Sequence, residues 1–333
     1  MGGAAPHVDA IVVNRDRASL LLASLRSVQE AFAEAGVRGE VIVVDNGSTD
    51  GSAELIEREL ESVRWIQLEG NNGFPAAVNA GLEQVSAEWV LLLNNDATID
   101  AAAIRRIMER PIPADVGTIA MQMRFSAQPG IVNSAGIGVD VLGVAYDRFL
   151  GCPADGPASR PGEVFGACAG AALFRRAMLE DIGRFDGGYF LYLDDADVAW
   201  RSRMAGWRAL YAPDAVVWHD HSATTRHGSS FKYFHVGRSR VRLVAKNADR
   251  RHLLRYGLQM VAFDLGYVAF VAIVDRSLAP LRGRIAGLRE WRAVRAETAP
   301  SRRPVRLARR HGFGAALRRR RAWLGGARRA QAA

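Results

Sequence analysis

Cysteine is scarce in this sequence of 333 residues, which contains only Cys152 and Cys168. Two cysteines supply neither a disulfide framework nor a four-ligand zinc site, so the small disulfide-rich and zinc-finger classes are excluded. Residues 1–9 also lack the basic start and apolar run of a secretory signal. We therefore expect a cytoplasmic protein from a reducing compartment.

Acidic residues become rare toward the C-terminus, and this imbalance contributes much of the formal net charge of +9. Between Arg276 and Arg329, arginines follow one another closely. Such a run can meet nucleic acid, anionic lipid headgroups or only solvent. No interleaving of aromatic and basic residues supports a nucleic-acid surface, so no nucleic acid is expected. We predict an anionic membrane surface as the partner of this basic tail, with a solvated extension as the alternative.

A long, uncharged apolar run is also missing. The most apolar stretch, residues 253–274, is short and contains Arg255 and Asp264. A membrane span needs about 20 largely uncharged residues. We therefore predict a helix that packs on the domain or lies at a membrane interface, as in a peripheral protein at the inner face of the cell membrane.

The N-terminal third alternates short apolar, β-rich runs with helical patterns. This alternation is typical of βαβ units and a parallel sheet, whose ligands bind outside the carboxyl ends of the strands. We predict an α/β fold with a Rossmann-like mixed sheet flanked by helices and followed by a helical, basic C-terminal extension. The predicted strands are 8–14, 40–45, 63–68 and 89–93, and the predicted helices are 19–35, 52–60 and 75–85.

The predicted organisation divides the chain into a catalytic domain, residues 1–247, and an Arg-rich helical extension, residues 248–333. Within the domain, residues 1–110 form the nucleotide-binding half and residues 111–247 the acceptor and catalytic half. Residues 115–162 are rich in Gly and Pro, which predicts an irregular region with short strands. Further on, we expect a helix at 175–182, a helix through Ala205, and strands at 209–212 and 215–217.

Polar residues follow the predicted strands at the edge where a ligand should bind. Asp45 is followed by Asn-Gly-Ser-Thr-Asp-Gly, a loop that could hold a nucleotide base and ribose. Asp96 ends the apolar strand 91–96 and could hold a divalent cation that neutralises a diphosphate. The alternative is that each aspartate caps a following helix, which for Asp96 would begin near Ala97.

Three acids at Asp194, Asp195 and Asp197 follow an aromatic and apolar run. Neighbouring carboxylates raise one another's pKa, which favours a general base that works near neutral pH. The alternative is a helix N-terminus whose dipole the acids complement. His219 could complete a metal site with Asp96, preferably for Mn²⁺ over Mg²⁺, or could be a structural histidine.

Taken in order, seven segments resemble the family 2 glycosyltransferases of GT-A fold, especially their rhamnosyltransferase-like bacterial branch. The resemblance runs from about Val8 to Asn247. Each segment alone is weak, but seven in order with familiar spacing are specific. They are residues 11–15, 41–51, 71–79, 91–96, 183–186, 194–197 and 212–219.

The resemblance implies a donor site in the N-terminal half. It implies that Asn14 and Arg15 border the nucleotide pocket and that Asp45 contacts the base. By the same resemblance, the donor's nucleotide and phosphates are lined by Asn72, Gly73, Asn79, Asn94 and Asn95.

The resemblance also implies the catalytic groups. Asp96 corresponds to the metal-binding end of the family's Asp-x-Asp motif, in which Asn94 replaces the first acid, and His219 joins it around Mg²⁺ or Mn²⁺. Asp195 corresponds to the base, and Asp194 stands where Glu is usual. The implied reaction is an inverting, in-line displacement on a nucleotide sugar.

The implied donor is dTDP-rhamnose, with galactofuranose, glucose or N-acetylglucosamine donors as alternatives. The implied acceptor is a hydroxyl of a glycan or lipid-linked sugar in cell-envelope polysaccharide synthesis. A nucleotidyltransferase would need a glycine-rich loop after the first strand, and Val13 to Arg17 contain no glycine. A non-catalytic protein that binds sugar nucleotides is the other alternative.

Overall fold

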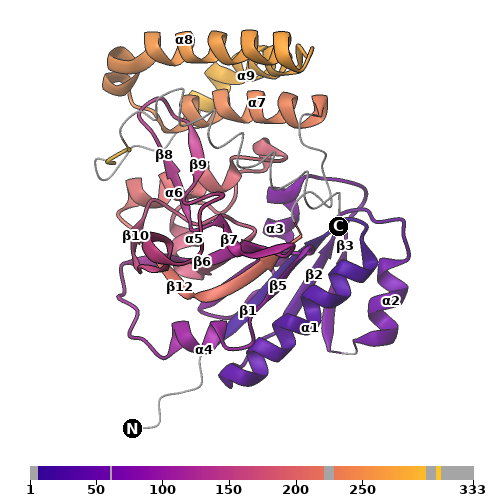
Figure 1. Ribbon diagram of the computed structural model, residues 1–333. Coiled ribbons are helices and arrows are strands. Elements are labelled where there is room, and N and C mark those ends of the chain that lie inside the picture. Colours follow the sequence, from indigo (N-terminus) through magenta and orange to yellow (C-terminus); the bar gives the residue numbers. More distant parts are fainter. Residues whose placement is uncertain (1–6, 61, 221–228, 298–304, 309–333) are drawn as a thin grey trace.

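The computed structural model describes residues 7–60, 62–220, 229–297 and 305–308. A ten-stranded mixed sheet forms the centre of the molecule, with helices on both faces and a separate helical layer at one end (Figure 1). The predicted α/β class with a mixed sheet and C-terminal helices is therefore confirmed. Most of the basic tail, including residues 309–333, lies outside the described residues.

The first half of the chain follows the predicted alternation of strands and helices closely. Its elements are β1 (Val8–Asn14), α1 (Ala18–Ala35), β2 (Val41–Asp45), α2 (Ser52–Glu59), β3 (Val63–Gln67), α3 (Phe74–Leu82), β4 (Trp89–Asn94), β5 (Ala97–Ile99) and α4 (Ala103–Met108).

The second half completes the sheet and adds the helical layer. Its elements are β6 (Val116–Phe125), β7 (Gln128–Ser134), β8 (Ile137–Val139), β9 (Ala145–Asp147), η1 (Gly156–Ser159), β10 (Gly162–Val164), β11 (Ala171–Arg175), α5 (Arg176–Asp181), η2 (Gly187–Tyr189), α6 (Asp194–Ala205), β12 (Arg208–His219), α7 (Ser230–Asn247), α8 (Arg250–Val274) and α9 (Ala279–Ala296).

The sheet has the strand order β10-β12-β6-β11-β4-β1-β2-β3, with β5 paired to β12 and β7 to β6. Strands β3, β2, β1 and β4 are parallel, and β11 runs antiparallel between β4 and β6. The carboxyl ends of β1, β2 and β4 therefore meet at one edge, where a parallel sheet binds its ligands.

Two apolar cores lie on opposite faces of the sheet, because successive side chains of a strand point to opposite faces. Along β1, Val12 packs into the core that contains Leu25 of α1, while Ile11 packs into the core that contains Val78 of α3. Strands that are buried on both faces read as continuous apolar runs, as β4 does.

Two predictions for the second half were wrong, and one alternative for the first half is excluded. The segment after Asp96 is the strand β5, which pairs with β12, so Asp96 does not cap a helix. Residues 115–162 include β6, a ten-residue strand inside the sheet, so this region is more regular than predicted. The predicted strands 209–212 and 215–217 form the single strand β12, whose pairing with β6 is irregular between Ala212 and Val216.

Candidate active site

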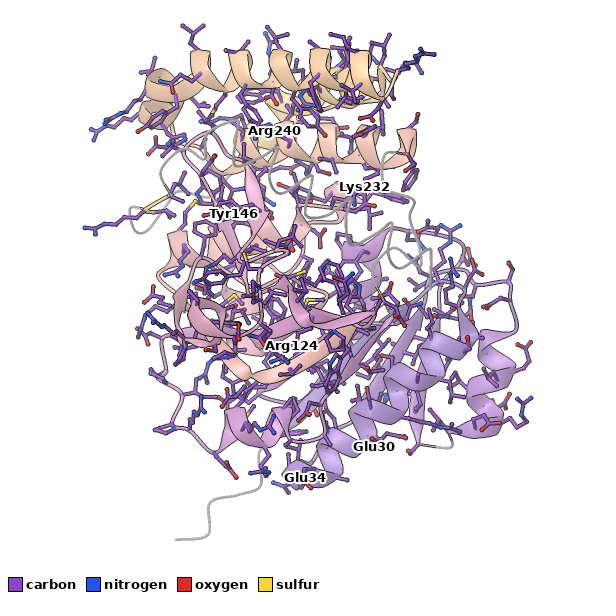
Figure 2. All side chains as sticks on the ribbon, viewed as in Figure 1. Glu30, Glu34, Arg124, Tyr146, Lys232 and Arg240 are labelled. Carbon is purple, nitrogen blue, oxygen red and sulfur yellow. The ribbon has the colours of Figure 1, made fainter. Side chains whose placement is uncertain are left out.

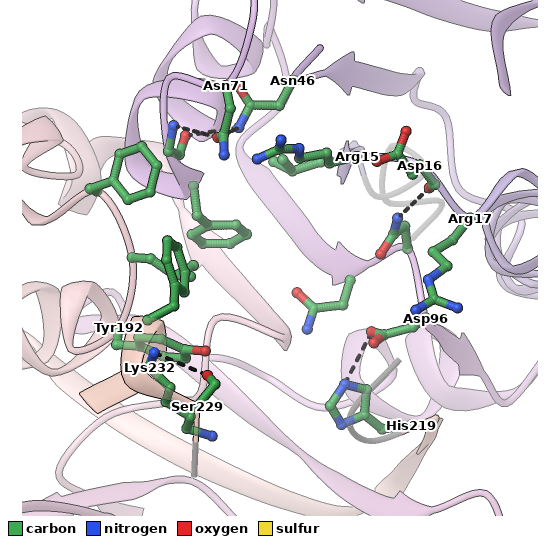
Figure 3. A pocket seen from close by; sticks show the side chains of 18 residues that line it. Arg15, Asp16, Arg17, Asn46, Asn71, Asp96, Tyr192, His219, Ser229 and Lys232 are labelled. Carbon is green, nitrogen blue, oxygen red and sulfur yellow. Dashed lines mark hydrogen bonds and ion pairs between the residues drawn. The ribbon is translucent and has the colours of Figure 1, made fainter. Parts of the chain in front are cut away.

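A pocket of about 670 Å³ opens at the edge where β1, β2 and β4 end (Figure 3). It combines polar groups from these strand ends with an aromatic wall and the first turn of α7. Its lining residues include Arg15, Asp16, Arg17, Asn46, Asn71, Gly73, Phe74, Asn94, Asn95, Asp96, Phe190, Tyr192, His219, Phe231 and Lys232. Of the predicted site residues, the pocket gathers Arg15, Gly73, Asn94, Asn95, Asp96 and His219.

Asn14 and Asp45 lie beneath the pocket, with exposed fractions of 0% and 1%. Asn14 donates through Nδ2 to Asp45 Oδ1 at 3.0 Å. The backbone amide of Ser48 donates to Asp45 Oδ2 at 2.9 Å, and Gln67 Nε2 donates to the same oxygen at 2.7 Å. Asp45 thus fixes the loop after β2, and its buried carboxylate accepts hydrogen bonds from the protein itself.

Asn95 connects this buried layer to the pocket. Its Nδ2 donates to Asn14 Oδ1 at 2.8 Å and to the carbonyl oxygen of Asp16 at 3.3 Å. The hydrogen bonds hold the segment 15–17, which lines the pocket, against the end of β4. Asp16 and Arg17 both have positive φ, at 59° and 68°, so this turn is held in an unusual backbone conformation.

The loop before α3 contributes Gly73, while the predicted residues Asn72, in this loop, and Asn79, within α3, make contacts inside the protein. Gly73 has φ 83°, and a Cβ there would lie 2.4 Å from the carbonyl oxygen of Phe190. Asn72 is exposed and donates to the carbonyl oxygen of Glu69 at 3.1 Å. Asn79 does not line the pocket, because its side chain accepts from and donates to the backbone of Phe185.

The predicted metal pair is brought together from distant parts of the sequence. Asp96 Oδ1 lies 3.1 Å from His219 Nε2, and the two residues are 123 positions apart in the chain. Pairing of β5 with β12 creates this contact, since β5 follows Asp96 directly and His219 ends β12. His219 Nδ1 lies 3.0 Å from Asn133 Oδ1.

This donor set fits a divalent cation. Nε2 of His219 faces the Asp96 carboxylate while Nδ1 contacts Asn133 Oδ1, so a neutral His219 could bind a cation together with Asp96. A hydrogen bond on the far ring nitrogen is the usual support for a metal-binding histidine. No cluster of three or more His, Cys, Asp or Glu side chains that could hold a metal occurs within the described part of the chain.

The predicted catalytic acids lie at the first turn of α6, directly after the aromatic wall formed by Phe190 and Tyr192. Burial and the nearby carboxylate of Asp147 raise the pKa of Asp195 to about 6. Burial and Asp195 raise the pKa of Asp194 well above its usual range. Neither acid is among the residues that line the pocket, but Tyr192, three positions before Asp195, is.

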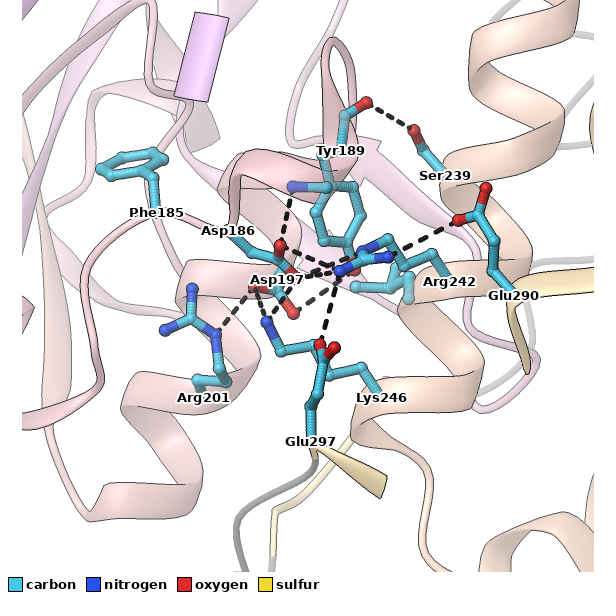
Figure 4. A network of polar contacts seen from close by, with 12 residues as sticks. Phe185, Asp186, Tyr189, Asp197, Arg201, Ser239, Arg242, Lys246, Glu290 and Glu297 are labelled. Carbon is cyan, nitrogen blue, oxygen red and sulfur yellow. Dashed lines mark hydrogen bonds and ion pairs between the residues drawn. The ribbon is translucent and has the colours of Figure 1, made fainter. Parts of the chain in front are cut away.

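Asp197 is a structural residue, unlike the two acids before it. Its side chain is fully buried and accepts from Arg201 Nε at 2.7 Å and Asn247 Nδ2 at 2.8 Å. Lys246 lies 3.4 Å from the same carboxylate and 2.6 Å from Asp186 (Figure 4). This network ties α6 to α7, so it holds the first turn of α6 in place.

The sequence reading missed several residues that line the pocket. Asn46 donates to Asn71 Oδ1 at 3.1 Å, and together they shape the turn that precedes Gly73. Both asparagines stand in the polar segments that follow strands, so the strand-end rule could have found them. Phe231 comes from α7, and no local sequence signal connects it to the pocket. Lys232 of the same helix was not missed, because the basic residues Lys232 and Arg238 after His219 are predicted from the sequence to add positive charge at a diphosphate, with a solvated surface role as the alternative.

Comparison with known proteins identifies the family of this chain and its fold. The family model described as glycosyl transferase family 2 matches residues 9–183, which is more than half of the chain. The chain therefore belongs to glycosyl transferase family 2. As a member with this fold and site, the protein is a glycosyltransferase.

One curated relative and two solved structures illustrate the relationship. The N-acetylglucosaminyl-diphospho-decaprenol L-rhamnosyltransferase of Mycobacterium tuberculosis is 27% identical over 245 residues, which cover 66% of this chain and 74% of the relative. The mannosyltransferase PcManGT from Pyrobaculum calidifontis, in complex with GDP-Man and Mn²⁺, has a TM-score of 0.54 at 18% identity and covers 86% of each chain. TarS 1–349 of S. aureus, in complex with UDP-GlcNAc, has a TM-score of 0.53 at 17% identity, covering 87% of this chain and 90% of that chain. The two structures share the fold, which is that of GT-A glycosyltransferases.

Proposed function

We propose that this glycosyltransferase moves a sugar from a nucleotide-sugar donor to an acceptor hydroxyl in a single inverting displacement that depends on a divalent metal. The observation that carries the proposal is the pairing of Asp96 with His219 in a pocket whose aromatic wall leads directly to Asp195. An in-line displacement needs a base at the acceptor and positive charge at the leaving group, and this arrangement can supply both.

Asp195 is the proposed base. A carboxylate with a pKa of about 6 is ionised at neutral pH but is still basic enough to accept a proton from an attacking hydroxyl. Asp194 sits beside it, more deeply buried, and its proposed role is to position the base or the acceptor. Asp147 raises the pKa of Asp195 and therefore tunes its basicity.

Asp96 and His219 are the proposed ligands of Mg²⁺ or Mn²⁺, and the mixed oxygen and nitrogen donors suit Mn²⁺ better. Such an ion supplies charge neutralisation for the departing diphosphate. With two ligands from the protein, the remaining ligand positions would be filled by diphosphate oxygens and water. Arg15 and Arg17 line the same pocket and add positive charge for the donor's phosphates.

Lys232 also lines the pocket, and its ammonium lies 5.3 Å from the centre of the Tyr192 ring. Burial lowers the pKa of Lys232, while the carboxylate of Asp147 opposes this shift. We propose that it contacts the donor diphosphate. Arg238, another basic residue of α7, instead pairs with Glu290 at 2.9 Å.

The proposed donor is dTDP-rhamnose, and the proposed acceptor is a lipid-linked sugar in cell-envelope polysaccharide synthesis. The support is the similarity to a relative named as a rhamnosyltransferase of a diphospho-decaprenol acceptor. Galactofuranose, glucose and N-acetylglucosamine donors remain alternatives within the same class. A lipid-linked acceptor would place the enzyme at the inner face of the cell membrane, which the basic C-terminal region favours.

The test is a donor panel with the purified full chain, Mg²⁺ or Mn²⁺, and N-acetylglucosaminyl-diphospho-prenol as acceptor. We expect release of dTDP from dTDP-rhamnose that depends on acceptor and metal. Asp195→Asn and Asp96→Ala should both abolish release, whereas Asp115→Asn, an exposed control, should not. Turnover of a different nucleotide sugar would reject rhamnose but keep the reaction class.

A further inference from the structure

One face of α8 is apolar and open to solvent. Its large side chains recur along a single stripe of the helix, at intervals of three, four and eight residues. The exposed fractions are 88% for Leu254, 85% for Leu258, 56% for Val261, 61% for Leu265 and 78% for Ile273. Among the described residues, α8 is the one helix long and apolar enough to cross a membrane.

The apolar surface continues onto α9. Leu278, just before α9, is 53% exposed, and Leu281, Ile285 and Leu288 are 36%, 41% and 60% exposed. Side chains at these intervals share one face of the helix. We call the exposed apolar side chains of α8 and α9, with Leu278, the docking face. Exposed large apolar side chains gathered on two neighbouring helices of a folded protein point to an interaction site.

Charged side chains are segregated around the docking face. Each of the two helices contains a single carboxylate, and both point inward. Asp264 accepts from Arg240 and Arg284, each at 2.7 Å. Glu290 accepts from Arg238 at 2.9 Å. Exposed charges on the two helices and the turn between them are arginines: Arg250, Arg251, Arg255, Arg276, Arg282, Arg289 and Arg292.

Contacts near its start, in its middle and directly after its end hold α8 flat on the domain. Near its start, His252 Nε2 donates to the carbonyl oxygen of Val141 at 2.9 Å. Directly after its end, Asp275 accepts from the Tyr233 hydroxyl at 2.7 Å. Asp264 anchors the middle, and Figure 1 shows α8 lying along the layer of α7 and α9. A helix tied at both ends to the same side of the domain cannot span a bilayer.

The first turn of α7 connects this layer to the active-site pocket. Phe231 and Lys232 line the pocket, and Tyr233, the next residue, holds Asp275 at the end of α8. The pocket and the docking face therefore share one structural element. A surface attached through α8 would bring the pocket to a fixed position beside it.

We propose that the docking face inserts flat into an anionic bilayer leaflet, with α8 in the plane of the interface and the surrounding arginines at the lipid headgroups. An apolar helical face with cationic flanks and no exposed carboxylate within α8 or α9 matches this partner. The inference deepens the proposed function by naming the surface that meets the membrane. It assigns this role to α8 and α9, and not to the residues beyond 308.

The test is flotation of the full-length protein with vesicles of phosphatidylglycerol and phosphatidylcholine. We expect Leu258→Glu/Leu265→Glu to bind at least about 100-fold more weakly than the wild type, because two inserted leucines are lost. The matched control, Ala23→Glu/Ala33→Glu, adds the same charge at exposed positions of α1, the helix that carries Glu30 and Glu34 away from α8 (Figure 2). It should bind like the wild type.

Charge is tested by lipid composition and by removal of arginines. Vesicles of phosphatidylcholine alone should bind the wild type at least tenfold more weakly. Arg282→Ser/Arg289→Ser should weaken binding to anionic vesicles about fivefold for each arginine removed. Calorimetry with a nucleotide sugar on the same samples measures donor binding in the active-site pocket independently of the membrane. A variant that loses vesicle binding but keeps donor binding supports the role of the docking face, whether or not the proposed reaction is correct.

Two results would overturn the proposal. If Leu258→Glu/Leu265→Glu floated with vesicles as well as the wild type does, another part of the chain would be responsible for membrane binding. A wild-type protein that ignores vesicles but sediments as a dimer, which the double variant dissociates, would make the docking face an interface between two copies.

Discussion

Replacement of Asp195 by asparagine should abolish transfer and at the same time stabilise the fold. Asn keeps an oxygen that can accept from the Ala196 amide, as Asp195 does at 2.7 Å, but it carries no charge. The pKa of Asp195 rises from 3.8 to about 6 on folding, chiefly because of burial and then because of Asp147. A difference of this size corresponds to at most about 3 kcal/mol, at 1.36 kcal/mol per pH unit.

The pH dependence of this effect follows from its sign. The folded state binds the Asp195 proton more tightly than the unfolded state, so the ionised form costs stability. That cost is absent below pH 3.8, grows as the pH rises, and is complete above about pH 6. Asp195→Asn should therefore gain up to about 3 kcal/mol at pH 8, or roughly 4 °C in Tm for a chain of this length, and little at pH 4.

Thermal unfolding at pH 8 and pH 4 measures the stability, and nucleoside diphosphate release measures the activity. Wild-type kcat/KM should fall about tenfold per pH unit below pH 6, because the base must be ionised. Asp115→Asn, whose side chain is 54% exposed, is the matched control and should change neither quantity. Retained activity in Asp195→Asn, or lost stability at pH 8, would refute the assignment of Asp195 as the buried base.

Three further predictions concern the proposed metal ligands, the backbone conformation of Gly73 and the polar network around Asp197. Asp96→Ala and His219→Ala should each weaken Mn²⁺ binding at least about tenfold in the presence of nucleoside diphosphate, as measured by calorimetry, and unchanged binding would remove that residue from the metal site. Gly73→Ala should lower the free energy of unfolding in urea by about 1–3 kcal/mol and raise the KM for the donor. The control Gly70→Ala should have smaller effects, because Gly70 also has positive φ but no atom lies within 4 Å of the added Cβ. Equal effects of the two variants would exclude a role for the Phe190 contact. Asp197→Ala should destabilise the fold by about 3–5 kcal/mol in the same assay, because it leaves buried cationic partners unpaired; a loss below about 1 kcal/mol would contradict the structural role of this carboxylate.

The parallel half of the fold could be predicted because its signals are local. Strands β1, β2 and β4 are apolar runs buried on both faces, and each ends at a polar residue. The antiparallel half depends on pairings between distant segments. The contact of β5 with β12 decides that Ala97–Ile99 is a strand, and nothing in those three residues excludes the start of a helix.

The candidate site also combines features that the local sequence predicts with features that depend on the tertiary structure. The sequence predicted that Asp96 and His219 would meet, and they do, because β5, which follows Asp96, pairs with the end of β12. It could not separate a residue that lines the pocket from one beneath it. Asp45 ends a strand just as Asp96 follows one, yet hydrogen bonds from Asn14, Ser48 and Gln67 keep its carboxylate buried. The role of Lys232 depends on how α7 packs, which is a tertiary property.

Donor binding tests the central claim most directly, because it needs neither the acceptor nor a membrane. Calorimetric titration of the full chain with nucleotide sugars should show that at least one donor binds, that Mn²⁺ tightens its binding, and that Asp96→Ala removes the effect of the metal. If no nucleotide sugar bound in the presence of Mn²⁺, the assignment of this pocket as a metal-assisted donor site would be contradicted.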